Sequence, residues 1–391
     1  MFGLMSRAAK VGAIIAVLTT GAAYAADEEF VVGMTAPLTG PLAEFGTAFQ
    51  NATTLVVEEV NAAGGIPTKD GKITLVLKVL DDANSADRGL ANIRRLVQQD
   101  GAKAALSLSG PVARAIAPFA EDRKIPHLTA SWMVPDPAWT HTFPIVAPPP
   151  QFSEGWGWVA QNMPEIKRVA TFVPDDAVGQ WTEVASGTNA KKHGLEVVAQ
   201  ERFTRGSTDL TAPLRKLLAS EPQAIDFGGS GAGNVGLAVR QLRELGYKGT
   251  FADFGATSTE VVAKIAGGAD QIEGYVSGGY AQSGLPESVT AWEKKFTARF
   301  GRYQPESSDR VNAILALEEA LRKSGSVDPQ VLTETINGLK FNSIWGEAAF
   351  VPMQGETPAV MITYPVPLCQ VRAGVCELVG TIPTVESVIK P

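Results

Sequence analysis

The sequence predicts an α/β protein made of two similar lobes, each with a parallel, doubly wound sheet. Apolar runs such as Ile73–Leu80 alternate with amphipathic segments such as Ala86–Gln99, which is typical of βαβ units. The apolar runs are continuous, as expected for strands that are buried on both faces. The same order of elements starts again after the proline-rich stretch Val134–Phe152, so two units are expected.

The first unit begins with a strand at Phe30–Met34 and a turn that leads into a helix at Leu42–Ala63. Thr39 and Gly40 lie in this turn, and Pro41 suits the first helical position because its missing N–H is not needed there. Free N–H groups at a helix N-terminus, together with the Thr39 hydroxyl, favour a small anion, although an ordinary βα turn explains the pattern equally well. The remaining elements of this unit are expected at Ile73–Leu80, Ala86–Gln99, Ala104–Leu108, a helix ending at Arg123, and Pro126–Ala130.

The second unit follows the same pattern. Its elements are expected at Val169–Val173, Trp181–His193, Leu195–Gln200, Leu210–Ala219, Ala224–Gly228, Val235–Leu245, Thr250–Asp253 and Ile272–Gly279. Helices at Pro286–Phe300 and Asp309–Ser324 come next, and the tail Ala348–Val388 consists of short β segments.

The first 25 residues have the pattern of a secretory signal peptide. Arg7 and Lys10 precede a short apolar run, Val11–Leu18, and small residues up to Ala25 offer a cleavage site. The run is shorter than the roughly 20 residues that span a bilayer, so export by the general route to the periplasm is expected, with an uncleaved anchor as the alternative. Cysteines 369 and 376 are then expected to form a disulfide that closes a hairpin.

Composition and charge restrict the function. Without Arg7 and Lys10 the chain has 32 basic and 41 acidic residues, a net charge of −9, which argues against nucleic acid or an anionic membrane as partner. The roughly 366 remaining residues exceed what one core usually serves. No metal site, cofactor or catalytic group is expected, because the three histidines are far apart and neither a G-x-S-x-G motif nor a nucleophilic cysteine is present.

Six small or polar turns follow the predicted parallel strands, where open α/β sheets bind ligands. If they face each other across a cleft, they form a clamp. In the first lobe the turns are Leu38–Gly40, Ser109–Pro111 and Ser131–Met133, and in the second they are Asp175–Gly179, Gly229–Gly233 and Asp253–Gly255.

One of these turns also resembles a dinucleotide fingerprint. Gly231–Gly236 reads G-x-G-x-x-G after a strand, and Asp253 ends the next strand, where an acid would bind a ribose hydroxyl. Close helix packing explains the glycines equally well, and export in an unfolded state argues against a nicotinamide cofactor. The paired acids Asp81-Asp82 and Asp175-Asp176 could bind a cation or act as acid and base, but they are expected to cap the helices that follow them.

Several aromatic residues lie near the predicted turns and offer walls for a flat apolar ligand. Trp156, Trp158 and Trp181 are expected in the helix–sheet core, whereas Trp132 is harder to assign to it because it ends a strand. Phe45 and Tyr280 lie close to other turns.

The chain resembles the periplasmic solute-binding proteins of ABC importers that are related to the leucine/isoleucine/valine-binding protein. The resemblance covers essentially the whole mature chain. It is carried by Gly33–Gly46, Glu58–Ile66, Asp81–Ala83, Leu96–Asp100, Ala117–Asp122, Asp209–Leu218 and Tyr303–Pro305.

The resemblance implies two Rossmann-like lobes of the type I periplasmic binding fold, joined by three crossovers, that close around a ligand. The crossovers are expected near Phe143–Pro148, Val276–Tyr280 and Phe341–Glu347. The N-terminal lobe then comprises residues 26–143 and 280–343, and the C-terminal lobe residues 144–279 and 344–391. Loops matching Ser109, Gly110 and Pro111 and matching Ser131, Trp132 and Met133 would hold the ligand carboxylate, and Phe45 would cover it.

Departures from the family pattern bear on the ligand. Val178 and Ser230 stand where amino-acid-binding members have tyrosines, and Gly255 stands near their acid for the ammonium group. Asp253 or Asp176 could substitute for that acid. The apparent lack of an ammonium partner favours an aromatic or branched aliphatic acid without an amino group.

We therefore expect a monomeric, non-enzymatic binding protein that delivers a small carboxylate to an ABC permease of the inner membrane. A branched-chain or other amino-acid-binding protein of the same family is the alternative. Two further alternatives are an exported dinucleotide-dependent enzyme and the ligand-sensing subunit of a signalling system.

Overall fold

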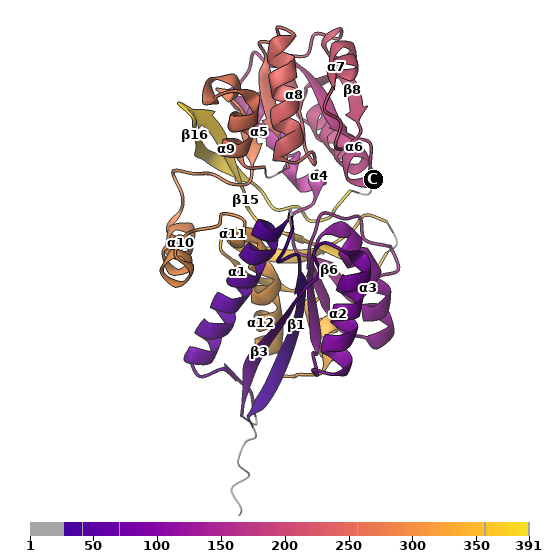
Figure 1. Cartoon of the computed structure of the whole chain (residues 1–391), viewed down its shortest axis with the longest axis vertical. Coiled ribbons are helices and arrows are strands. Elements are labelled where there is room, and N and C mark those ends of the chain that lie inside the picture. The colour runs from indigo at the N-terminus through magenta and orange to yellow at the C-terminus, as the bar shows by residue number, and fades with distance from the viewer. Residues whose placement is uncertain (1–26, 41, 70, 256, 356, 390–391) are drawn as a thin grey trace, which may run out of the picture.

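The computed structural model describes residues 27–40, 42–69, 71–255, 257–355 and 357–389. The predicted signal segment and Pro41 lie outside the described residues. Figure 1 shows two tiers of helices and strands, with the N-terminal elements in the lower tier, the middle of the chain in the upper tier and the C-terminal strands running between them. Among the described residues, no helix has the length and apolar character needed to cross a bilayer.

The lower tier is built on a six-stranded sheet with the order β2-β3-β1-β4-β5-β6. All neighbouring strands are parallel except β2, which pairs with β3 in the antiparallel sense. The strands are β1 (Glu28–Ala36), β2 (Ile66–Pro67), β3 (Lys72–Asp81), β4 (Ala104–Leu108), β5 (His127–Ala130) and β6 (Thr142–Pro144). The inner strands β1 and β4 are almost completely buried, because helices cover both faces of the sheet.

Helices from two parts of the chain surround this sheet. From the first part come α1 (Ala43–Ala62), α2 (Ala86–Gln98) and α3 (Gly110–Arg123), and from the second come α10 (Glu287–Phe300), α11 (Ser307–Arg310), α12 (Asn312–Ser324) and α13 (Pro329–Ile336). Helices α10, α11 and α12 all contact α1, so the late helices complete the core that the first part of the chain starts.

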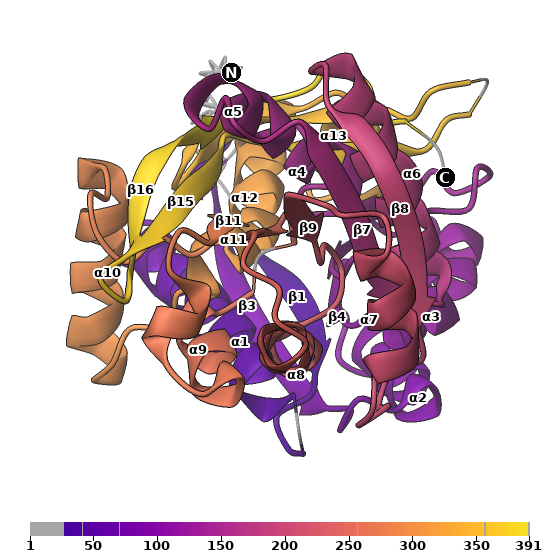
Figure 2. The ribbon, with the colours of Figure 1, turned by 90° about the horizontal axis from the view of Figure 1, so that it is seen from above.

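The upper tier contains a seven-stranded sheet with the order β16-β15-β11-β10-β9-β7-β8. Strands β7 to β11 run parallel to their neighbours, whereas β15 and β16 are antiparallel additions at one edge, beside β11 (Figure 2). The strands are β7 (Arg168–Pro174), β8 (Glu196–Phe203), β9 (Ala224–Asp226), β10 (Thr250–Asp253), β11 (Val276–Gly278), β15 (Val366–Arg372) and β16 (Val375–Ile382). The helices of this part are α4 (Pro149–Phe152), α5 (Gly155–Asn162), α6 (Ala177–Lys192), α7 (Thr211–Leu218), α8 (Ala232–Glu244) and α9 (Thr259–Ala266), with a 3₁₀ turn at Ala269–Ile272.

The structure confirms the predicted α/β class with doubly wound sheets. Most expected elements form within a few residues of their predicted bounds, as α1 and β4 show. The proline-rich stretch Val134–Phe152, expected as a linker, contains the edge strand β6 and the short helix α4. These elements are too short to carry a periodic pattern, and the prolines at the start of α4 occupy the first helical turn, where they are tolerated.

A third, small sheet packs on the lower tier. It consists of β12 (Lys340–Ser343), β13 (Gly346–Pro352) and β14 (Val360–Thr363), and it packs through β14 on β6 and through β12 on α12. After this small sheet the chain returns to the seven-stranded sheet at Val366. The domain boundaries remain a prediction, but the pairing of β12 with β13 favours a third crossing after Thr363 over one at 341–347.

The expected disulfide between Cys369 and Cys376 is present and links the two strands of the hairpin β15–β16. Ala373 and Gly374 form its turn, both with positive φ (50° and 83°), which matches the twist of a tight hairpin. Both cysteines are fully buried in the core of the upper tier. The bond therefore fixes the edge of the sheet that the last crossing creates.

Replacing both cysteines by serine is expected to lower the free energy of unfolding by about 2–3 kcal/mol, because the unfolded chain regains the entropy of the closed loop. Denaturant unfolding of the oxidised protein and of C369S/C376S measures this difference. Reduction of the wild type should reproduce it, and an unchanged midpoint in both cases would contradict the stabilising role.

Candidate ligand-binding cleft

A cavity of about 1080 Å³ lies between the two tiers and is lined by residues of both. The lower tier contributes Leu42, Glu44, Phe45 and Trp132, and the late segments contribute Tyr280, Arg302, Tyr303 and Glu306. The upper tier contributes Arg205, Gly229, the first turn of α8 (Gly231–Asn234) and the start of α9 (Thr257–Val261). Its size suits a small organic ligand, and its walls combine aromatic rings with a few charged groups.

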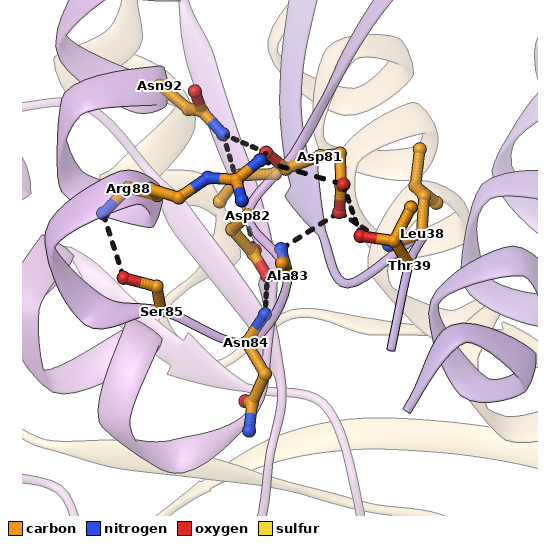
Figure 3. A network of polar contacts seen from close by, with 10 residues as sticks. Leu38, Thr39, Asp81, Asp82, Ala83, Asn84, Ser85, Arg88 and Asn92 are labelled. Carbon is orange, nitrogen blue, oxygen red and sulfur yellow. Dashed lines mark hydrogen bonds and ion pairs between the residues drawn. The ribbon is translucent and has the colours of Figure 1, made fainter. Parts of the chain in front are cut away.

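The turn after β1 is held in place by the carboxylate of Asp81 at the end of β3 (Figure 3). One oxygen of Asp81 accepts hydrogen bonds from the N–H groups of Leu38 (2.9 Å) and Ala83 (2.8 Å), and the other accepts from the Thr39 hydroxyl (2.6 Å). This Thr39 contact, against the cost of burial, lowers the pKa of Asp81 to about 2. The Thr39 hydroxyl, predicted as a ligand donor, is thus already engaged, and Gly40 beside it is exposed with φ of +84°.

Asp82 fixes the same strand ends from inside. It accepts hydrogen bonds from the Thr35 hydroxyl (3.0 Å) and the Asn84 N–H (2.8 Å), and burial raises its pKa. The expectation that the Asp81-Asp82 pair caps the next helix is wrong, because Ser85 is the N-cap of α2. The pair instead ties the ends of β1 and β3 together.

The two loops expected to hold a carboxylate lie next to each other at the ends of β4 and β5. A Cβ on Gly110 would lie 3.8 Å from the Trp132 carbonyl oxygen. Ser109 has a left-handed backbone (φ 75°), and its buried hydroxyl has no hydrogen-bond partner among the described residues. Pro111 occupies the first turn of α3, which has no side-chain cap.

The second of these loops divides between core and cavity. Ser131 is buried and contacts the Thr129 hydroxyl (3.0 Å), and Met133 is buried as well. Trp132 lines the cavity and packs on Phe152 with ring centroids 5.2 Å apart. Trp132 is therefore the residue of this loop that faces the cleft.

Phe45 and Tyr280 line the cavity above a buried ion pair that sequence reasoning missed. The Arg310 guanidinium lies 2.8 Å (nitrogen to oxygen) from the Asp309 carboxylate, and its central carbon lies 5.2 Å from the centre of the Phe45 ring. The same guanidinium donates to the Tyr280 hydroxyl (3.1 Å). Burial raises the pKa of Tyr280 well above its usual value, so the phenol is neutral. This cluster orients two aromatic walls of the cleft.

Arg205 connects the predicted ligand loops of the upper tier. It donates to Asp176 (2.5 Å) and to the carbonyl oxygens of Gly229 (2.7 Å) and Ser230 (3.0 Å). A guanidinium has five N–H donors, so two remain for other acceptors. Burial opposes ionisation of Asp176, but the contact with Arg205 and the cap bond from Gly179 outweigh it and lower the pKa. Asp176 is thus a helix cap, as predicted, and an anchor for Arg205.

The other predicted residues of this tier, Val178, Ser230 and Asp253, do not line the cavity. Ser230 is 1% exposed, and its hydroxyl has no partner among the described residues. Val178 packs against Gly229: a Cβ added to Gly229 would lie 3.2 Å from Cγ1 of Val178. Asp253 is fully buried, accepts a hydrogen bond from Thr257, and has its pKa raised to about 7 by burial. An acid in this position cannot reach a ribose or an ammonium group in the cleft without rearrangement.

The glycines of the G-x-G-x-x-G motif also have structural roles. Gly231 begins α8 with φ of +80°, and a Cβ on Gly236 would lie 2.7 Å from Ile265 of the neighbouring helix α9. Only a glycine permits this close packing. The first turn of α8 nevertheless faces the cavity. Because Gly231 has no side chain that could cap the helix, the N–H groups of this first turn are available to an acceptor.

Of the three tryptophans expected in the core, Trp156 and Trp181 are fully buried and Trp158 is half-buried. Trp156 is fully buried and donates to the Ser186 hydroxyl (2.8 Å), and Trp181 is fully buried and donates to the Ile389 carbonyl (2.9 Å). Trp158 is half-buried beside Gly380. None of the three lines the cavity.

Four glutamates that the sequence did not single out also line the cavity: Glu44, Glu260, Glu293 and Glu306. Glu44 and Glu260 lie in the first turns of α1 and α9, Glu293 lies in the middle of α10, and Glu306 follows Tyr303, so none of them directly follows a strand. Among the described residues, no group of three or more His, Cys, Asp and Glu side chains could hold a metal ion.

The sequence pattern of the periplasmic binding protein family matches residues 29–367. The chain belongs to this family. Its relatives include an amino acid binding protein from Pseudomonas aeruginosa, 29% identical over 325 residues that cover 82% of this chain and 85% of the relative. A Leu/Ile/Val-binding protein homolog from Brucella melitensis is 31% identical over 233 residues, which cover 58% of this chain and 61% of the relative.

Solved structures share the fold. The branched-chain amino acid transporter substrate binding protein LivJ from Streptococcus pneumoniae, in complex with isoleucine, matches with a TM-score of 0.71 and 18% identity over 92% of this chain and 100% of that chain. A solute-binding protein from R. palustris in complex with 4-hydroxybenzoate matches with a TM-score of 0.71 and 19% identity; the match covers 91% of this chain and 98% of that chain. The family model describes a periplasmic binding protein, and the curated relatives are amino-acid-binding and Leu/Ile/Val-binding proteins.

Replacing Asp81 by asparagine is expected to lower the free energy of unfolding by about 1 kcal/mol at pH 7, because charge-assisted bonds to Leu38, Thr39 and Ala83 are weakened. The pKa of Asp81 is lower in the folded protein, about 2 against 3.8, so its ionised form stabilises the fold above pH 3.8. The difference between wild type and variant should shrink as the pH falls from about 4 towards 2.

Denaturant unfolding of both proteins at several pH values measures this, with Asp122→Asn, an exposed acid on α3, as the control. A difference that is the same at pH 2.5 and pH 7 would contradict the assigned role of Asp81.

Proposed function

We propose that this periplasmic binding protein captures a small carboxylate with an aromatic or branched aliphatic body and delivers it, as a monomer, to an ABC permease. The observation that carries the proposal is the cavity between the two tiers, with Phe45, Trp132, Tyr280 and Tyr303 as aromatic walls. Flat or branched apolar groups fit between such rings, and a few polar groups fix their orientation.

Two sets of donors, one beside the cavity and one lining it, support a carboxylate ligand. In the lower tier, the loop Ser109–Pro111 has an unpartnered hydroxyl at the uncapped start of α3. This loop does not line the cavity itself, but it lies next to Trp132, which does. In the upper tier, Arg205 retains two N–H groups beside the uncapped first turn of α8. A ligand that contacts both tiers would favour the closed arrangement, since it gains binding energy from both only when they approach.

An aromatic acid as the ligand is supported by the ligands bound in two related structures. Two solute-binding proteins of the same fold were solved with 4-hydroxybenzoate and with 3,4-dihydroxybenzoic acid. An amino acid is the second candidate, favoured by the amino acid binding relative from P. aeruginosa and by the glutamates in the cleft.

We also propose that the first 25 residues are removed on export, with cleavage after Ala25.

A thermal-shift panel of leucine, 4-methylpentanoate, benzoate and 4-hydroxybenzoate tests the carboxylate class. A true ligand at a hundred times its Kd stabilises the protein by about 2.7 kcal/mol, which raises the Tm by several degrees. At least one of these acids is expected to produce such a shift, whereas its carboxamide should not. The carboxylate proposal fails if no acid shifts the Tm or if acid and amide shift it equally.

Arg205→Gln is expected to weaken binding of that acid about tenfold, equivalent to 1.4 kcal/mol, because a charge-assisted contact is lost. Since the variant also loosens three loops, the informative quantity is the ratio of acid to amide affinity, which titration calorimetry measures. A purely structural role of Arg205 would reduce both affinities and leave the ratio unchanged.

A further inference from the structure

After its last strand the chain returns from the upper tier to the lower one. Strand β16 belongs to the seven-stranded sheet and ends at Ile382. Val388 then pairs in the parallel sense with Met353, which directly follows β13 of the small sheet on the lower tier. Residues 383–389 therefore form a strap between the tiers, in addition to the three crossings before it. This segment is the C-terminal strap.

Hydrogen bonds attach the beginning of the C-terminal strap to both tiers. The Pro383 carbonyl accepts from the side chain of Gln151 in α4 of the upper tier (3.0 Å). The Val385 N–H donates to the hydroxyl of Thr363 in β14 (3.0 Å), and this hydroxyl in turn donates to Gln151 (3.0 Å). The strap thus begins beside the third crossing, where the chain passes from β14 to the upper sheet.

The far end of the strap is bonded on two sides. The Val388 N–H donates to the Pro352 carbonyl (3.0 Å), and the Val388 carbonyl accepts from the Gln354 N–H (2.8 Å), so this side is attached to the small sheet. On the other side, the indole of Trp181 in α6 donates to the Ile389 carbonyl (2.9 Å). One short segment is therefore bonded to the lower tier and to a helix of the upper tier.

An apolar cluster surrounds this far end. Val388 and Trp181 are fully buried in it. Met353 and Met361 also belong to the cluster, and Val134, from the loop after β5, packs on it. The cluster joins side chains of both tiers, yet none of these five residues lines the ligand cavity. It therefore stabilises the arrangement of the tiers without touching a ligand.

These contacts are specific for the present arrangement of the tiers. A gap of about 0.5–1 Å already removes a large part of a van der Waals contact, and a hydrogen bond weakens steeply when it is misaligned. If the tiers move together around a ligand, either Trp181 separates from Val388 or the strap detaches from the small sheet. Both movements cost free energy, which opposes closing.

We propose that the C-terminal strap holds the cleft open and sets how readily the two tiers close. Contacts that stabilise the open arrangement lower the population of the closed one, and the apparent affinity for a ligand falls with that population. The inference rests on the proposed capture of a ligand between the tiers, and it adds regulation of that capture by a segment outside the cavity.

Spin labels on the two tiers test this without a ligand. Asp87→Cys on α2 and Arg240→Cys on α8 place the labels at exposed positions outside the cavity, and the native cysteines are engaged in their disulfide. With the native strap, double electron–electron resonance should give one narrow distance. Val388→Ala, which reduces the apolar contact, and Trp181→Phe, which removes the indole N–H, should each add a second distance from molecules whose tiers have closed.

Val371→Ala is the matched control, because Val371 is also a fully buried valine but lies in the core of the upper tier. It removes the same two methyl groups and should leave one distance. The inference is overturned if the native strap already gives both distances or if Val388→Ala and Trp181→Phe leave only one. A second distance in Val371→Ala would overturn it as well, since general loss of packing would then explain the effect.

Titration calorimetry with leucine and 4-hydroxybenzoate separates this inference from the proposed function. An acid that binds the wild type should bind Val388→Ala about threefold more tightly, because closing then costs less free energy. An equal or weaker affinity would contradict the role of the strap. Failure of both acids to bind any variant would count against the proposed function, whereas the distance measurement would still decide on the strap.

Discussion

Parallel pairing of the strands is the constraint on which the cleft depends. In each main sheet the parallel strands end at the same edge, so the turns that follow them are brought together whatever their separation in the chain. The loops around Thr39, Ser109 and Trp132 become neighbours in this way, and so do those around Asp176 and Gly229. Because the chain crosses between the sheets, these two edges border one cavity.

Side chains then make these loops stiff. Asp81 binds the β1 turn to the end of β3, and Arg205 binds three loops of the upper tier through one guanidinium. Neither contact lies within a single βα unit. Each residue therefore converts a set of independent turns into one rigid wall, so that a ligand meets preorganised groups when the lobes approach.

The fold could be predicted because its signals are local. Continuous apolar runs gave β1, β3 and β4, and helix stops such as Gly64 gave the end of α1. The site was predicted only in part. Phe45, Trp132 and Tyr280 do line the cavity, but Ser230 and Asp253 are buried behind it. Strand-end position indicates which turn faces the cleft, and the local backbone decides which side chain of that turn points into it.

Arg205 and Glu306 were missed for a different reason. Arg205 lies in the turn after β8, but this strand extends three residues beyond its predicted end at Gln200, so the turn was not among those predicted. Glu306 follows no strand and lies beside the pair of Asp309 and Arg310. Both residues line the cavity, and Arg205 is held there by the distant loop of Gly229. Such contacts depend on tertiary structure that one sequence does not display. Their charges nevertheless determine the electrostatics of the cleft, and hence which members of the family's ligand range this protein can accept.

The central claim is that one ligand contacts both walls of this cleft. A crystal structure of the protein with the acid that binds most tightly tests it directly. We expect the ligand between Phe45 and Trp132 of the lower tier and Arg205 with the first turn of α8 of the upper tier, with the cavity smaller than its present 1080 Å³ or so. A ligand found outside this cavity, or in contact with only one tier, would contradict the account.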